Sequence, residues 1–406
     1  MRHAALTTMV LLSSVAYIPE SYAASQLAAC MVCGPGTYAS GGTCVPDPAG
    51  TDPAVTYQIN AAHNGNQPVD ALRVPLIKRW SRNLGGTVSY PLIAGSRVFV
   101  TVANTSTYGS KLYALDSATG VTLWSADIAG TYYFSAAAYD NDRVFVINYD
   151  GLLKAFNAST GAQIWSSQLT GQYSFTSPPT AFNGTVFVGG AGSGGTLYAV
   201  SESTGVVLWT APVSNGDHSA AAVSSAGAYV SYACAQTYGF SPASGTLLWR
   251  YSTFCSGGGG KTPVLHNGKL YVRDTTVGNV VLDAATGTSS GTFSANRAPA
   301  FDGNLGFFLN GSTLNAMDLT TNSLLWTFAG DNALSSAPIV VNGRVIVGSY
   351  NGNLYVLNES TGAVISSVAV GSGIPGADEQ SASQLSGLAA GNGLLLVPAG
   401  TQLVAY

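Results

Sequence analysis

The feature that most constrains this chain is a phrase that recurs about every forty residues. Its first clear copy, residues 112–124, is LYALDSATGVTLW. Close variants end at Trp165, Trp209, Trp249 and Trp326. A period of this length is typical of a propeller, in which each repeat forms one blade that cannot bury its apolar surface alone.

Each copy has the pattern of a β-hairpin. Alternating apolar residues such as Leu112 and Ala114 indicate a strand, Asp116 can hydrogen-bond the backbone of the turn, and Gly120 supplies a positive φ. The tryptophan four residues after the glycine is expected to dock on its own blade or on the adjacent one, because it must bury a large apolar surface. Further Asn-Gly and Asp-Gly turns upstream indicate two more strands, which makes four strands in each repeat.

The repeats also predict how the ring closes. Seven repeats are complete, whereas the eighth, residues 387–406, lacks its outer strand, and residues 78–81 around Trp80 supply a spare strand before the first repeat. We therefore predict an all-β fold: an eight-bladed β-propeller of four-stranded antiparallel blades, with the ring closed by the N-terminal strand pairing with the last blade. Gly291 and Ser366 replace the tryptophan in repeats five and seven, and we expect those blades to dock less firmly.

The N-terminal residues predict export. Residues 1–24 combine a basic start, an apolar run and small residues, which is the pattern of a signal peptide. Residues 25–56 are interpreted as a short Cys-bearing segment and Pro-rich linker, and residues 57–406 as the propeller. No later apolar run is long enough for a transmembrane span. We expect a protein of the periplasm or the cell surface.

Five cysteines in an exported chain favour disulfides. The sequence LAAC ending at Cys30 has the form of a lipobox, so Cys30 is a candidate for lipidation that would make this an outer-membrane lipoprotein; earlier cleavage remains the alternative. Cys33 is then expected to pair with Cys44. Cys234 follows a second strand and Cys255 follows a fourth strand, and these positions meet at one end of a blade, which predicts a second disulfide.

Charge limits the partners. Only 8% of residues are charged and no basic run could neutralise a phosphate backbone, so nucleic acid is not an expected partner. His63 and His266 lack companions at metal-ligand spacing and are interpreted as surface or turn residues. We expect a monomer without a metal site.

The recurring LYALDxxTGxxLW phrase is similar to the pyrroloquinoline-quinone (PQQ)-like propeller repeat over about residues 78–406. That family includes quinone-dependent dehydrogenases and non-catalytic propellers such as the outer-membrane assembly lipoprotein. The resemblance to the dehydrogenases implies PQQ held beneath a disulfide of two adjacent cysteines, beside calcium and a catalytic aspartate. This sequence has no Cys-Cys pair and no aspartate that can be matched, so we expect no catalytic residue and no cofactor.

We therefore expect a non-catalytic propeller that acts as a protein-binding or scaffolding module in the bacterial cell envelope, with an envelope protein or cell-surface polymer as partner. One alternative is a quinoprotein-type oxidoreductase that uses PQQ and calcium, and another is a glycan-binding surface protein, suggested by the 21 tyrosines. Propellers commonly bind ligands at the mouth of the central funnel. The candidate funnel residues are Tyr133, Phe175, His218, Lys261 and Arg297.

Overall fold

The computed structural model describes residues 37–40, 43–46, 53–253, 255 and 258–406. The chain forms two units, residues 1–47 and 48–406. The described part of the first unit is a hairpin in which β1 (Thr37–Ser40) pairs antiparallel with β2 (Thr43–Pro46). The predicted signal peptide, Cys30 and Cys33 lie outside the described residues. Within the described residues no helix is long and apolar enough to cross a bilayer.

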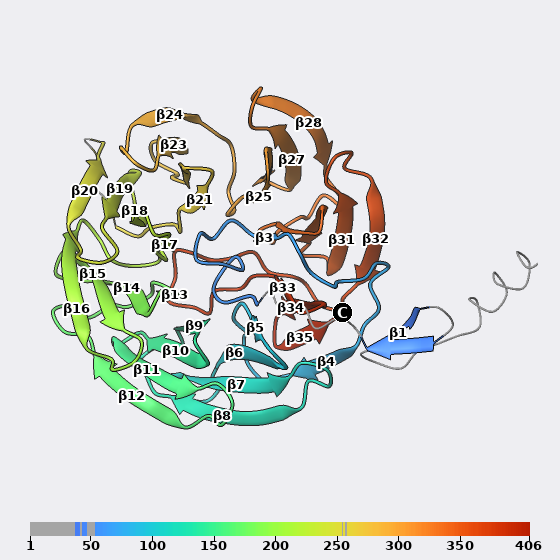
Figure 1. The fold of residues 1–406 in the computed structure, drawn as a ribbon, viewed down its shortest axis with the longest axis horizontal. Helices are drawn as coiled ribbons and strands as arrows, with labels where there is room; N and C mark the ends of the chain where they lie inside the picture. The colour runs from blue at the N-terminus through green and yellow to red at the C-terminus, as the bar shows by residue number, and fades with distance from the viewer. Residues whose placement is uncertain (1–36, 41–42, 47–52, 254, 256–257) are drawn as a thin grey trace, which may run out of the picture. The chain divides into compact units, whose positions relative to one another are not determined.

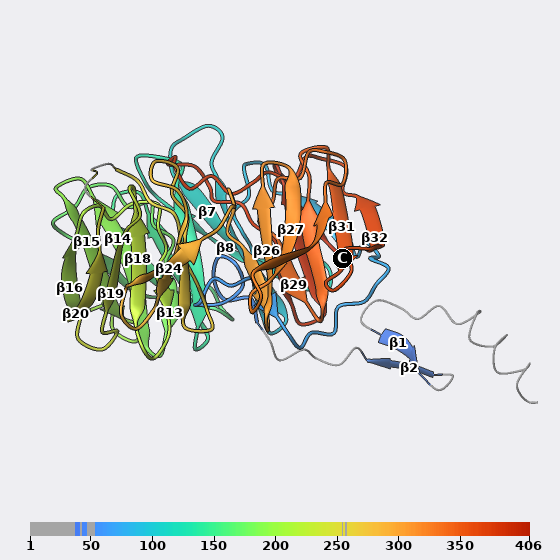
Figure 2. The same cartoon turned by 90° about the horizontal axis from the view of Figure 1, so that it is seen from above.

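The second unit is a ring of eight antiparallel sheets of four strands each, with one sheet extended by a further strand, as Figure 1 shows. Figure 2 shows the same strands from above. The predicted all-β, eight-bladed propeller is confirmed. Blades 1 and 2 consist of β5 (Leu92–Ala94), β6 (Arg97–Ala103), β7 (Ser110–Asp116), β8 (Thr122–Ile128), β9 (Ser135–Asp140), β10 (Arg143–Asn148), β11 (Leu152–Asn157) and β12 (Gln163–Gln168).

The middle blades follow the same order along the chain, with the first strand of each innermost. Blades 3 and 4 consist of β13 (Thr180–Phe182), β14 (Thr185–Ala191), β15 (Gly195–Ser201), β16 (Val207–Val213), β17 (Ala222–Val223), β18 (Ala228–Tyr232), β19 (Gln236–Phe240) and β20 (Leu247–Tyr251). Blades 5 and 6 consist of β21 (Val264–His266), β22 (Lys269–Val272), β23 (Val280–Asp283), β24 (Ser289–Thr292), β25 (Ala300–Asp302), β26 (Leu305–Asn310), β27 (Thr313–Asp318) and β28 (Ser323–Phe328).

The last two blades each use a strand from the N-terminal part of the chain. Blade 7 consists of β29 (Ile339–Val341), β30 (Arg344–Gly348), β31 (Asn353–Asn358) and β32 (Val364–Ala369), with β3 (Asn66–Gln67) added in parallel beside β29. Blade 8 consists of β33 (Ala389–Gly391), β34 (Leu394–Ala399), β35 (Gln402–Ala405) and β4 (Trp80–Asn83). β4 pairs antiparallel with β35, placing Trp80 opposite Ala405. The predicted ring closure is therefore confirmed.

Each tryptophan links its blade to the next one. Its indole Nε1 donates a hydrogen bond to a backbone carbonyl in the turn between the third and fourth strands of the following blade, with N···O distances of 2.8–3.1 Å. The accepting residues are Ser117, Ala158, Glu202, Pro242, Ala284 and Glu359. Each tryptophan thus docks on the adjacent blade. The hydrogen bond from Trp80 to Ser117 joins blade 8 to blade 1.

In each socket that receives an indole, two positions are occupied by small residues. A Cβ added to the turn glycine would lie only 2.4–2.7 Å from the ring, as at Gly287 against Trp249. Across the strand pair, the residue opposite the tryptophan is Ala or Gly, for example Gly239 opposite Trp249. The ring thus needs both positions free of larger side chains, since packed interiors leave no spare volume.

Both blades without the tryptophan lack a matching socket. In blade 5, Gly291 lies opposite Val281, and the turn of blade 6 carries Asn322 at φ 54° in place of glycine. In blade 7, Ser366 lies opposite Val356. Blade 8 has no turn between its third and fourth strands, because β35 and β4 come from opposite ends of the chain. The absent tryptophans therefore go together with changes in the residues that would receive them.

Residues 54–67 form a central hub, which the repeat pattern does not predict. This segment makes a hydrogen bond of 2.7–3.0 Å to every one of the eight blades. The hub residues that make these bonds, in blade order, are Ala54, Val55, Thr56, Ala61, Ala62, Asn64, Gly65 and Gln67. The hub begins at Ala54, before the expected domain start at residue 57, and Figure 1 shows it as the blue trace through the centre.

His63 belongs to this hub and is fully buried, so its interpretation as a surface residue is wrong. Its ring nitrogens lie 2.7 Å from the carbonyl of Tyr57 and 2.9 Å from the carbonyl of Ala221. Burial lowers the pKa of His63. This histidine is a structural element that ties the hub to blade 4. His266 is also buried, where it stacks on Phe301 with ring centroids 4.6 Å apart.

A second segment, residues 370–388 between β32 and β33, also crosses the centre of the ring (Figure 1). The carboxylate of Glu379 in this segment accepts two hydrogen bonds from Arg273 of blade 5, at 2.7 and 3.0 Å, in a fully buried pair. Burial alone raises the pKa of Glu379, but Arg273 outweighs it and holds the pKa below its ordinary value. Gln384 accepts a hydrogen bond from Thr101 of blade 1. The chain itself thus occupies the middle of the propeller.

Candidate functional site

The loops of blades 1 and 2 bring four tyrosines together at one end of the propeller. Tyr108 lies in the hairpin between β6 and β7, Tyr132 and Tyr133 lie in the connection between β8 and β9, and Tyr149 lies in the turn after β10. Because turns between second and third strands and connections between blades emerge at the same end, these loops are neighbours. We call these four residues the tyrosine patch.

The rings of the patch touch one another and remain accessible. Ring centroids are 5.2 Å apart for Tyr108 and Tyr133, 6.2 Å for Tyr108 and Tyr132, and 4.3 Å for Tyr132 and Tyr149. The exposed fractions are 61% for Tyr108, 47% for Tyr132 and 40% for Tyr133. Adjacent rings are tilted by 51–52°, so the patch is a ridged surface and not a flat platform.

Hydrogen bonds hold the loops that carry the patch. The backbone N–H of Gly109 donates to the carbonyl of Tyr132 at 3.0 Å, which links the hairpin to the connection. The N–H and hydroxyl of Thr131 both donate to the carboxylate of Asp150. These bonds fix the loops, so the tyrosines are presented with little conformational entropy to lose on binding.

A groove of about 550 Å³ lies beside the tyrosine patch. The hairpin that carries Tyr108 contributes Thr105, Ser106 and Thr107 to the lining of the groove. Lys111 and Asp127 also line the groove and form an ion pair of 3.2 Å. Blade 1 therefore offers an aromatic surface and a polar groove side by side.

Two of the candidate funnel residues differ in their exposure to solvent. Tyr133 belongs to the tyrosine patch. Phe175 is fully buried, so it is not available to a partner at the surface, and the expectation for this residue is wrong. Its ring fits against Gly151 and Gly190, where an added Cβ would come within 2.4 and 2.5 Å of it. Because these glycines have no side chain, they leave space for the phenylalanine ring to pack in the core.

The other three candidates lie beside different elements. The imidazole Nδ1 of His218 is 3.3 Å from the carboxylate of Asp217, and Nε of Arg297 donates to the carbonyl of Ser335 at 3.0 Å. Lys261 lines a small cavity of about 170 Å³ together with Arg273. Burial, reinforced by the charge of Arg273, lowers the pKa of Lys261. Lys261 and Arg297 lie beside the segment 370–388, and none of the three residues belongs to the tyrosine patch.

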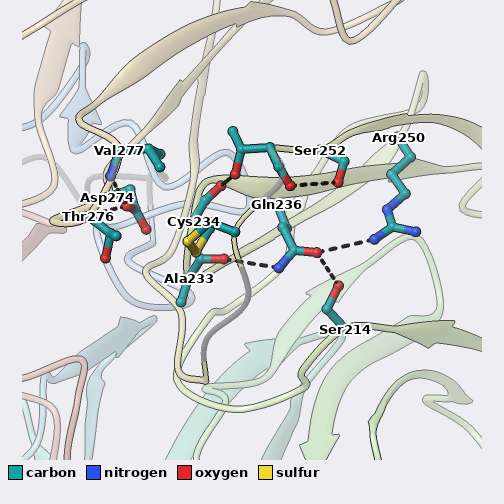
Figure 3. The surroundings of a disulfide bond; sticks show 11 residues. Ser214, Ala233, Cys234, Gln236, Arg250, Ser252, Asp274, Thr276 and Val277 are labelled. Atoms are coloured by element: carbon teal, nitrogen blue, oxygen red, sulfur yellow. Dashed lines mark hydrogen bonds between the residues drawn. A yellow bond between two sulfur atoms is a disulfide. The ribbon is translucent and has the colours of Figure 1, made fainter.

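The structure contains a disulfide between Cys234 and Cys255, as the sequence predicts, with Cα atoms 5.7 Å apart. Figure 3 shows its surroundings. The carbonyl of Cys234 accepts a hydrogen bond from Thr253 at 2.7 Å, and Gln236 bridges the carbonyl of Ala233 and the guanidinium of Arg250. The disulfide thus fastens the connection that leaves blade 4. No partner for Cys44 can be described, because Cys33 lies outside the described residues.

The described residues contain no group of three or more His, Cys, Asp or Glu side chains that could hold a metal ion. The carboxylate of Glu379 near the centre is engaged by Arg273.

Fold, repeat and closure together define an eight-bladed propeller of PQQ-like repeats. A family model described as outer membrane protein assembly factor BamB matches residues 109–238 and 233–385, which is more than half of the chain. The chain belongs to this family. No curated protein sequence matches the chain significantly.

Solved structures share the fold at low sequence identity. The crystal structure of BamB from Moraxella catarrhalis superposes with a TM-score of 0.62 at 16% identity, covering 81% of this chain and 99% of that chain. Quinohemoprotein alcohol dehydrogenase from Comamonas testosteroni superposes with a TM-score of 0.66 at 14% identity, covering 88% and 80%. The computationally designed Ika8 protein gives 0.63 at 16% identity, covering 82% and 98%. These likenesses show the fold alone.

Proposed function

We propose that this protein is an exported, non-catalytic propeller that binds a protein partner in the bacterial cell envelope through the tyrosine patch. The observation that carries the proposal is the gathering of four tyrosines from three loops, three of them 40–61% exposed. Tyrosine is enriched at the centres of protein interfaces, because its ring contributes area and its hydroxyl a hydrogen bond. The name of the matching family, outer membrane protein assembly factor, supports a partner of this kind.

The form of the patch favours a protein over a sugar. A sugar ring stacks on one open aromatic face, whereas the adjacent rings here are tilted by 51–52° and form no common flat surface. Such a ridged cluster suits the uneven surface of a folded partner or of a peptide. The polar groove beside it, with Thr105, Ser106 and Thr107, extends the contact area with hydrogen-bonding groups.

The proposal is tested by affinity capture from the native cell envelope after cross-linking. The test variant combines Tyr108→Ser, Tyr132→Ser and Tyr133→Ser. The matched control is Tyr350→Ser, which removes a tyrosine that is 57% exposed on a turn of blade 7. We expect one defined partner at constant stoichiometry with the wild type and the control.

Loss of a hot-spot tyrosine at an interface costs about 2 kcal/mol or more, which is about 30-fold in Kd. With purified partner, the triple variant should therefore bind at least about 30-fold more weakly, whereas the control should bind like the wild type. Equal binding by the triple variant would exclude the patch. Binding of defined glycans, lost in the same variant, would replace the protein partner by a carbohydrate.

A further inference from the structure

The empty tryptophan position of blade 5 opens a cleft towards blade 6. The cleft has a volume of about 750 Å³ and is lined by Gly291 from the outer strand β24, by Val281, and by Leu319 and Asn322 from blade 6. A Cβ added at Gly291 would meet no atom within 4 Å. The strands of blade 5 are also short, with four residues each in β22, β23 and β24.

The floor of the cleft is aromatic. Tyr271, Phe293 and Phe308 all line it, with centroids 5.4 Å apart for Tyr271 and Phe293, 6.0 Å for Tyr271 and Phe308, and 5.6 Å for Phe293 and Phe308. The thioether of Met317 adds a group that contacts rings favourably. Burial raises the pKa of Tyr271 to about 12.

The rest of the molecule shows what such a position accepts. In five of the six filled sockets an indole packs beside an aromatic residue of the second strand, as Trp124 does 5.9 Å from Phe99, and donates to a turn carbonyl. Tyr271 occupies the register position of Phe99, and Leu319 follows Asp318 as Ser117 follows Asp116 in blade 1. The cleft thus has the aromatic residue of a filled socket, and Leu319 stands at the chain position of the accepting carbonyl. Asn322 and Val281 line the cleft beside them.

We propose that this cleft binds an aromatic side chain presented by a segment of a partner protein. Aromatic rings prefer edge-on and offset contacts with other rings, which the three tilted rings of the floor provide. Lys269 and Asn315 stand at the cleft with polar groups that suit the backbone of such a segment. The site lies between blades 5 and 6 and shares no residue with the tyrosine patch, so it stands or fails separately from the proposed function.

Met317 gives a direct reporter of the cleft. The sequence has four methionines, and Met317 is the only one after residue 31. The protein is labelled with [13C-methyl]methionine and titrated with the peptide acetyl-Ser-Gly-Trp-Gly-Ser-amide, while the matched peptide with Leu in place of Trp serves as the ligand control. The Met317 resonance is assigned with the variant Met317→Leu.

We expect a saturable shift of the Met317 methyl signal with a Kd of roughly 1 mM or below, and binding of the Leu peptide that is at least about tenfold weaker. A variant with Gly291→Trp, Val281→Ala and Asn322→Gly fills the cleft from within and should weaken peptide binding at least about tenfold, read by fluorine NMR of a 5-fluorotryptophan peptide. Ser289→Trp adds a tryptophan on the same strand outside the cleft and should leave binding unchanged.

No shift of the Met317 signal at millimolar peptide would overturn the proposal. Equal binding of the Leu peptide, or undiminished binding by the filled variant, would overturn it as well. The variant without Tyr108, Tyr132 and Tyr133 should keep the Met317 response in full, so a failure of the tyrosine patch cannot be mistaken for a failure of the cleft.

Discussion

The clearest prediction concerns building the missing tryptophan socket between blades 5 and 6. The variant combines Gly291→Trp with Val281→Ala and Asn322→Gly, which reproduces the three positions that accompany each docked indole. In the existing sockets the turn glycine cannot bear a Cβ, because that atom would lie 2.4–2.7 Å from the ring. The residue opposite the tryptophan is Ala or Gly, because a larger side chain would take up space that the ring needs.

The magnitude follows from the area that the ring buries. A tryptophan buries about 150–250 Å², and half of that at about 25 cal/mol per Å² gives about 2–3 kcal/mol. A new indole hydrogen bond adds about 1 kcal/mol. Fixing the side chain costs about 1 kcal/mol, and removing two methyl groups from Val281 costs about 1.6 kcal/mol. The net expectation is a stabilisation of about 1 kcal/mol.

The assay is thermal unfolding followed by circular dichroism and calorimetry. A gain of this size raises Tm by about 2–4 °C in a large domain. The single variant Gly291→Trp is the control and should give no gain, because the methyl groups of Val281 and the Cβ of Asn322 occupy the ring position. A single variant as stable as the triple one, or a triple variant less stable than the wild type, would refute the socket argument.

Three further outcomes are expected. Trp249→Ala, which removes an indole that is 9% exposed, should destabilise the protein by about 3–5 kcal/mol in urea unfolding. Replacing Cys234 and Cys255 by serine should lower the unfolding free energy by about 3 kcal/mol, because the disulfide closes a loop across a sequence separation of 21 residues; unchanged stability would contradict this. Burial raises the pKa of Glu202 from 4.5 to about 7, so the native state holds the proton more tightly and stability falls as pH rises from 4.5 through 7. Glu202→Gln should abolish that decline. If the unfolding free energies of the two proteins depended on pH in the same way, the assignment of the decline to Glu202 would be wrong.

The ring of blades was predictable from the sequence because each blade repeats the same local sequence pattern. The LYALDxxTGxxLW phrase combines strand alternation, a turn glycine and an indole, and each of these is visible in single residues such as Gly120 and Trp124. Ring closure was predictable for the same reason, since Trp80 marks a strand that has no repeat of its own. Local pattern and global fold agree at these positions.

The hub was not predictable, because residues 54–67 form no repeat and follow no regular period. Their conformation depends on eight surrounding blades, and Gln58, Ile59 and His63 adopt positive φ values of 55°, 76° and 55° that side chains of this kind favour only when the surroundings impose them. The local sequence does not indicate such a tertiary constraint.

The sequence predicts the tyrosine patch only in part. Tyr133 and Phe175 are both candidate funnel residues, but Phe175 is buried and its ring lies against Gly151 and Gly190. Tyr108, Tyr132 and Tyr149 were missed among the 21 tyrosines. Their sequence context could have identified them, because they lie in turns among small polar residues. Strand tyrosines such as Tyr113 instead alternate with apolar residues.

The most direct test of the account is site-specific photo-cross-linking in the intact native envelope. A photoreactive phenylalanine analogue is placed at Tyr108 in one protein and at Tyr350 in another, since both positions are exposed on turns of the propeller. One defined cross-linked protein is expected from position 108 and none from position 350. The absence of any cross-link at 108, or the same products from both positions, would contradict the claim that the tyrosine patch is the partner-binding surface.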